Sequence, residues 1–267
     1  MRQIGRLLGI LTCVLAGLVL DANALRAQES GQDQSLRVDL ELVLLADASG
    51  SIDDGEIFFQ RQGYAEAITD PDILAAIALG QDGRIAVTYV EWGSAESQEV
   101  VVPWSIIDGK ASAEAFAEKL MAVPRLAFGR NAIGSALAAG LALIEGNAID
   151  GYRKIIDFSG DSANNWGGLP VEVARQAALA ADVSINGLAI LCRACESGRP
   201  VAYDLEEAFE REIIAGPAAF VVTADGEQSF ATAVRRKLLL EIAGVLDEES
   251  FRQRLAAAGY DAGAAAR

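Results

Sequence analysis

Three oxygen-bearing side chains stand at alternate positions just after the most apolar run of the folded part of the chain. Asp47, Ser49 and Ser51 follow residues 38–46, which are apolar apart from Asp39 and Glu41. Such a run is typical of a strand buried on both faces of a parallel sheet. Ligands of these sheets bind beyond the carboxyl ends of the strands. A carboxylate and two hydroxyls placed there are suitable ligands for Mg²⁺, Ca²⁺ or Mn²⁺ rather than for zinc or copper.

Two further loops are expected at the same edge of the sheet. Asn131 stands at the start of a predicted helix, and Asp161 follows a predicted strand. Together with the first three residues they would supply five oxygen ligands or water-bridging groups, and few carboxylates with several waters is the coordination typical of Mg²⁺. Because hydroxyls and an amide do not neutralise the ion, an open coordination position would attract a carboxylate from a partner.

Strands and helices alternate along the rest of the chain, which predicts an α/β fold with helices on both faces of a mostly parallel sheet. The three-layer, doubly wound sheet is expected to have one antiparallel edge strand, because Ile85–Trp92 and Val100–Trp104 are close enough to form a hairpin. Further strands are predicted over 153–158, 183–191 and 218–223, and helices over 54–69, 113–122, 132–144, 171–181, 205–214, 227–243 and 248–257.

The first residues have the pattern of a secretory signal peptide. Arg2 and Arg6 precede the apolar stretch Leu7–Leu20, and small residues follow it. That stretch is shorter than the roughly 20 residues that cross a bilayer, so we expect cleavage and no membrane insertion afterwards. The sequence therefore predicts a signal peptide at 1–27, a leader at 28–36, one domain at 37–244 and a C-terminal helix and tail at 245–267, in a periplasmic or secreted protein.

The cysteines agree with export. One cysteine lies inside the predicted signal peptide, which leaves Cys192 and Cys195 as a Cys-Arg-Ala-Cys pair. In an oxidising compartment such a pair usually forms a disulfide. A redox motif would be expected at a helix N-terminus early in a thioredoxin-like order of elements. Here the pair follows a late strand, and glycine and proline come soon after it, so a structural disulfide is the prediction.

Composition excludes several classes of function. The 267 residues carry a net charge of −16, which disfavours binding to nucleic acid and to anionic membrane surfaces. The chain has no histidine, so Ser-His-Asp and Cys-His catalysis and histidine-bearing zinc sites are excluded. A Mg²⁺-dependent phosphoesterase with Asp47 as nucleophile remains as an alternative, although Ser49 stands where such enzymes normally carry a second acid. We therefore expect a binding module rather than an enzyme.

Asp47-Ala-Ser49-Gly-Ser51 resembles the Asp-x-Ser-x-Ser motif of von Willebrand factor type A domains, and the element order from Val38 to Gly244 resembles their fold. In that family the motif forms a metal-ion-dependent adhesion site. The resemblance implies that Asn131 takes the position of the family's threonine and Asp161 that of its second aspartate. The segment 157–165 and the segment 201–220 further resemble a group of exported bacterial members with no assigned function, which implies an extracytoplasmic binding module.

Some assignments stay open from the sequence alone. Asn131 could cap its own helix instead of binding an ion. Asp157 competes with Asp161 for the role of second aspartate, or it could pair with Lys154 or Arg153. If the site has decayed, the protein would be an interaction scaffold that needs no metal. Three residues near the predicted site are candidates for partner contact, with exposed tryptophan the strongest of them: Arg130, Asn164 and Trp166.

Overall fold

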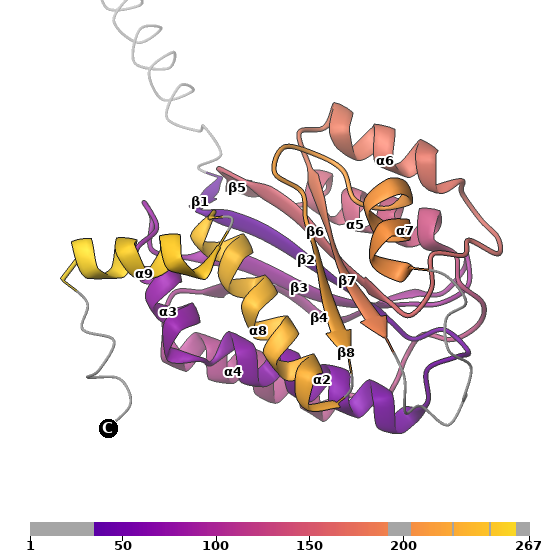
Figure 1. Cartoon of the computed structure of the whole chain (residues 1–267), viewed down its shortest axis with the longest axis horizontal. Helices are drawn as coiled ribbons and strands as arrows, with labels where there is room; N and C mark the ends of the chain where they lie inside the picture. Colours follow the sequence, from indigo (N-terminus) through magenta and orange to yellow (C-terminus); the bar gives the residue numbers. More distant parts are fainter. Residues whose placement is uncertain (1–34, 192–203, 226, 246, 260–267) are drawn as a thin grey trace, which may run out of the picture. The chain divides into compact units, whose positions relative to one another are not determined.

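The main sheet has six strands in the order β4-β3-β2-β6-β7-β8 (Figure 1). The computed structural model describes residues 35–191, 204–225, 227–245 and 247–259. All neighbouring strands are parallel except β3 and β4, which are antiparallel, so the predicted sheet is confirmed. The strands are β2 (Leu40–Asp47), β3 (Ile85–Trp92), β4 (Gln98–Ile107), β6 (Lys154–Gly160), β7 (Ser184–Leu191) and β8 (Val221–Asp225).

Helices cover both faces of the sheet and give three layers (Figure 1). One face packs against α2 (Asp54–Ile68), α3 (Pro71–Ala78), α4 (Lys110–Ala122), α8 (Glu227–Ala243) and α9 (Glu248–Ala257). The other face packs against α5 (Ile133–Glu145), α6 (Val171–Ala180) and α7 (Leu205–Glu212). A separate hydrophobic core lies on each side of the sheet. Within the described residues, none of the helices has the length and apolar character needed to cross a membrane.

The strand β2 is central because it pairs on both sides, with β3 and with β6. Every residue of β2 is buried, as its apolar run predicts. Of the two acids in β2, Asp47 ends the strand and Glu41 lies near its start, where the carboxylate of Glu41 accepts hydrogen bonds from Gly151 N at 2.9 Å and Asn147 Nδ2 at 2.7 Å. A buried carboxylate needs such donors, so Glu41 ties the start of β2 to the chain before β6.

The helix that follows the Asp47 turn begins with a capping box. The carboxylate of Asp53 accepts from Glu56 N at 2.8 Å, and the carboxylate of Glu56 accepts from Asp53 N at 2.8 Å. These reciprocal bonds satisfy two backbone donors at the start of α2 and fix where the helix begins. Asp70 then caps α3, with Pro71 at its first position, so the break expected after α2 is present.

Two features outside the main sheet complete the fold. A short two-stranded sheet joins β1 (Leu36–Val38) and β5 (Ile149–Gly151). The helix expected over 248–257 is present as α9, and its Phe251 and Leu255 are buried in the same core as α8.

A buried ionic cluster joins α8 to the sheet. Lys237 Nζ lies 2.7 Å from Asp157 Oδ1 and 2.5 Å from Glu241 Oε1, and all three side chains are almost fully buried. Asn186 Nδ2 also donates to Glu241 Oε1 at 2.9 Å. The expected pairing of Asp157 with Lys154 or Arg153 was therefore wrong, because α8 brings in a lysine 80 residues later in the chain.

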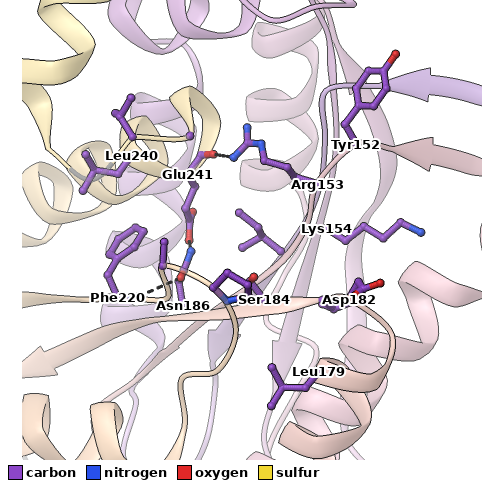
Figure 2. A pocket seen from close by; sticks show the side chains of 16 residues that line it. Tyr152, Arg153, Lys154, Leu179, Asp182, Ser184, Asn186, Phe220, Leu240 and Glu241 are labelled. Carbon is purple, nitrogen blue, oxygen red and sulfur yellow. Dashed lines mark hydrogen bonds between the residues drawn. The ribbon is translucent and has the colours of Figure 1, made fainter.

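The cluster borders a cavity of about 420 Å³, shown in Figure 2, whose lining includes residues at the starts of β6 and β7. Asn186 and Glu241 form part of its wall, together with the apolar side chains of Phe220 and Leu240. Arg153 donates a hydrogen bond to the carbonyl of Glu241 (Figure 2) and another to the carbonyl of Ile242, both at the end of α8. These bonds satisfy carbonyls that have no partner within the helix.

Candidate metal-binding site at the strand ends

The turn formed by residues 47–51, at the end of β2, is stabilised by the carboxylate of Asp47. Asp47 Oδ1 accepts a hydrogen bond from Ser49 N at 2.8 Å, and Ser49 Oγ lies 3.2 Å from Ser51 Oγ. Asp47 and Ser49 are fully buried, whereas Ser51 is exposed. The three predicted ligands therefore lie together at the end of β2, with Ser51 on the solvent side. The cap of α2 is Asp53, so these residues do not serve as its N-cap.

The side chain of Arg125 fixes the backbone of this turn through hydrogen bonds. Its guanidinium donates to Ala48 O at 2.6 Å, Ser49 O at 3.0 Å and Ile52 O at 2.9 Å. On the other side, Gln60 Nε2 donates to Asp47 O at 3.1 Å. Both residues position the candidate ligands, and neither could be identified from sequence pattern, because their partners here are backbone carbonyls distant in the chain.

The loop with Asn131 is hydrogen-bonded directly to the turn. Gly50 N donates to Gly129 O at 2.7 Å, and Ala132 N donates to Gly93 O at 2.9 Å. Gly129 has a φ of +103°, which a glycine adopts without strain. Asn131 is 8% exposed. The N-cap position of α5 is Ala132 and has no side-chain cap, so Asn131 does not cap its own helix.

Asp161 meets Asp47 at the end of β6. Its backbone N lies 3.4 Å from Asp47 Oδ2, although 114 positions separate the two residues. Asp161 Oδ1 is buried and has no hydrogen-bond partner. Asp157 lies three residues before the end of β6 and is occupied by Lys237. Of the two aspartates considered for this position, Asp161 is therefore the one beside Asp47.

The pKa values of Asp47 and Asp161 are both raised, which favours the protonated form of each carboxyl. Burial is the main cause that raises the pKa of Asp47 to about 7, and the charge of Asp161 raises it further, while hydrogen bonds from Ser49 act in the opposite direction. Burial likewise raises the pKa of Asp161, against hydrogen bonds from Ser51 and Asp47. Asp47 is buried and Asp161 is partly buried, and neither forms an ion pair with another described residue; a bound cation would supply the compensating positive charge.

The donor set suits a hard divalent ion. Within the described ranges there is no group of three or more His, Cys, Asp and Glu side chains that could hold a metal. The candidate site has two carboxylates only, and its other donors are hydroxyl and amide oxygens. Such a set fits an ion that keeps several waters, as Mg²⁺ does, and the unpartnered Asp161 Oδ1 is consistent with it.

The predicted partner-contact residues fall into two places. Arg130 lies over the ring of Trp166 at 4.6 Å, and Trp166 N donates to Asn131 O at 2.8 Å, so these two residues stand next to the candidate site. Asn164 is exposed and lines a separate hollow of about 270 Å³ with Asp204 and residues of α7. Cys192 and Cys195 lie outside the described residues.

Solved structures with the same fold include three adhesion or matrix proteins. A mussel byssus proximal thread matrix protein, solved with zinc in its MIDAS motif, has a TM-score of 0.54 and 19% identity over 78% of this chain and 49% of its own. The pilus adhesin SpaC of Lactobacillus rhamnosus GG has a TM-score of 0.54 and 14% identity, over 78% of this chain and 30% of its own. The vWF domain of the pilus tip protein Mfa5 of Porphyromonas gingivalis has a TM-score of 0.50 and 9% identity, over 78% of this chain and 96% of its own.

These likenesses establish the fold, and the chain spans only about half the length of the mussel protein. A comparison with curated proteins found no match. The family model described as "Protein of unknown function (DUF1194)" matches residues 37–246, which is most of the chain. The protein thus belongs to the DUF1194 family and has the fold of von Willebrand factor type A domains.

Proposed function

We propose that the protein is an exported binding module that uses a metal-ion-dependent adhesion-type site to bind an acidic group of a partner. In this proposal Asp47, Ser49 and Ser51 hold a divalent cation from β2, and Asn131 and Asp161 complete its shell from the two neighbouring loops. Mg²⁺ is the favoured ion, with Ca²⁺ or Mn²⁺ as substitutes.

The observation that carries the proposal is the meeting of Asp47 and Asp161. The buried carboxylate of Asp47 accepts a hydrogen bond from the backbone N of Asp161, which is partly buried, and Asp161 Oδ1 has no hydrogen-bond partner. A purely structural pair of this kind would cost stability, because neither charge is compensated. A cation bound between them would remove that cost. The neutral donors around them would leave the ion able to attract a further carboxylate.

Three supporting points concern the setting. We propose that residues 1–27 direct export and are removed, which would place the domain in the periplasm or outside the cell. The absence of histidine and the single acid in the Asp47 turn favour binding over catalysis. The solved structures with this fold include a pilus adhesin and a pilus tip protein, and adhesion is proposed for this chain by analogy only.

Calorimetric titration with Mg²⁺ tests the metal site. The full chain should bind one equivalent of Mg²⁺, and Asp47→Ala should abolish the heat of binding, because it removes one of the two carboxylates. Glu118→Ala is the matched control, since it removes an exposed acid on α4 and should leave the titration unchanged. Equal heats from wild type and Asp47→Ala would remove the metal claim and leave an interaction scaffold that needs no ion. Phosphoester turnover that needs Mg²⁺ and is lost in Asp47→Asn would instead favour an enzyme.

A further inference from the structure

Two exposed aromatic side chains stand on the loops that form the candidate metal site. Trp166 and Phe128 are 61% and 56% exposed, the largest fractions among the exposed large apolar side chains of the described residues. Phe128 precedes the Gly129-Arg130-Asn131 loop, and Trp166 follows Asp161 in the next loop. Exposed aromatic residues gathered beside a site are typical of surfaces that bind a partner.

Both rings are held in place while exposed. The Arg125 guanidinium lies 4.7 Å from the centre of the Phe128 ring, and Arg130 lies 4.6 Å from that of Trp166. The backbone is fixed as well, since Ser94 N donates to Phe128 O at 2.9 Å and Trp166 N donates to Asn131 O. Rings that are already ordered lose little conformational entropy when a partner covers them.

The positive charge of Arg130, beside the Trp166 ring, favours a ligand that carries a carboxylate. The protein carries a net charge of −16, yet Arg130 has no acidic partner in the part of the chain that the structure describes. Its guanidinium carbon lies 4.6 Å from the centre of the Trp166 ring, and its N–H groups make no hydrogen bond to any described residue, so they can bind a carboxylate. A ligand that meets this surface is therefore expected to be acidic and aromatic together.

We propose that Phe128, Arg130 and Trp166 form an aromatic rim that binds a peptide segment in which an aromatic residue adjoins the acidic residue held by the ion. The inference rests on the proposed function and specifies the partner: an acidic peptide with an aromatic neighbour, rather than any carboxylate. The rim would bind the aromatic side chain next to Trp166, while Arg130 would contribute to holding the acid.

Four acetylated, fluorescently labelled peptides test the rim on the full chain with Mg²⁺. They are Gly-Phe-Asp-Phe-Gly, Gly-Gly-Asp-Gly-Gly and the same two with Asn in place of Asp, and binding is followed by anisotropy. The first should bind about tenfold more tightly than the second, and both Asn peptides should bind more weakly still. Trp166→Ala should reduce the tenfold preference to near unity, whereas Trp166→Phe should keep most of it. Both variants should bind Mg²⁺ as wild type does in calorimetry.

Iodide quenching gives a second measurement that a structural role would not change. Trp92 is fully buried and Trp104 is partly buried, so Trp166, at 61% exposed, is the most accessible of the three tryptophans. The part of the quenching that Trp166→Phe removes should be protected by the Phe-containing acidic peptide. Normal Mg²⁺ binding with no preference for that peptide, or a preference that survives Trp166→Ala, would overturn the rim and leave the metal site standing. Absence of Mg²⁺ heat in the wild type would overturn the proposed function itself.

Discussion

We propose that Asn131 takes the position of the threonine in the von Willebrand A motif, and its side chain is almost buried. If its amide oxygen contributes to the ion shell, Asn131→Ala should weaken Mg²⁺ binding about tenfold, while Asn131→Thr should keep most of the affinity, because a hydroxyl can replace the amide oxygen. Calorimetric titration measures both. Equal affinity of wild type and Asn131→Ala would exclude this residue from the site but leave Asp47 and Asp161.

Residue identities in the site could be predicted from the sequence to different degrees. Asp47, Ser49 and Ser51 are adjacent in the chain and end a recognisable buried strand, so their grouping followed from local pattern. Asp161 could be separated from Asp157 only by the structure, because the choice depends on Lys237 in a helix much later in the chain. Arg125 had no signal, since it binds backbone carbonyls, which every residue has.

At the scale of elements, the ionic cluster under α8 should make stability depend on pH. Burial is the main cause that raises the pKa of Glu241 from 4.5 to about 7, and Asp157 raises it too, against Lys237 and Asn186. Arg153 is the other charged group nearby. Between pH 4.5 and about 7, Glu241 keeps a proton in the folded protein that it releases in the unfolded chain. The contribution of Glu241 to the free energy of unfolding should therefore fall as pH rises from 4.5 to about 7.

Glu241→Gln isolates this effect, because the neutral amide removes the titration while Lys237 still pairs with Asp157. The variant should exceed the wild type in free energy of unfolding by about 3 kcal/mol at about pH 8, and the difference should become small below about pH 4.5. Urea denaturation at several pH values measures it, with the exposed Glu118→Gln as control. A difference that stays constant across this range would contradict the assignment.

The contact of α5 with the Trp166 loop depends on a glycine. A Cβ added at Gly134 would lie 2.0 Å from Leu169 O, a backbone atom that cannot turn aside. Gly134→Ala should therefore lower the free energy of unfolding by about 2 kcal/mol and displace the loop, weakening Mg²⁺ binding as well. Gly109→Ala is the control, because a Cβ there meets nothing within 4 Å. Urea denaturation and calorimetry check both effects; equal results for the two variants would show that the contact does not matter.

The order and type of the elements could be predicted well, because alternating strands and helices with strong apolar runs leave few other arrangements. Strand β4 extends further in both directions than expected, from Gln98 to Ile107. At its start, pairing with β3 orders Gln98 and Glu99, which have no strand signal of their own. The β1 and β5 pair was not predicted. Strands of this length carry no detectable periodicity and form only through tertiary contact.

At the scale of the whole molecule, the net charge of −16 opposes the approach of an acidic partner. Salt screens this long-range repulsion more than it weakens a close contact with an ion. The association rate of Gly-Phe-Asp-Phe-Gly at saturating Mg²⁺ should therefore increase several-fold from about 0.02 to about 0.3 M NaCl. Stopped-flow fluorescence measures the rate, and the Asn version of the peptide should show a weaker dependence. A rate that falls with salt would mean that local positive charge controls the encounter.

The guanidinium of Arg125 has a consequence for how the ion would enter. Its hydrogen bonds hold the carbonyls of Ala48, Ser49 and Ile52 through contacts within the protein itself. The ion would thus meet a preorganised cradle, with no loop to fold around it. Exchange would then be governed by the slow loss of water from Mg²⁺, so attachment through this protein could be made and broken by changes in free cation alone, while the domain itself keeps its shape.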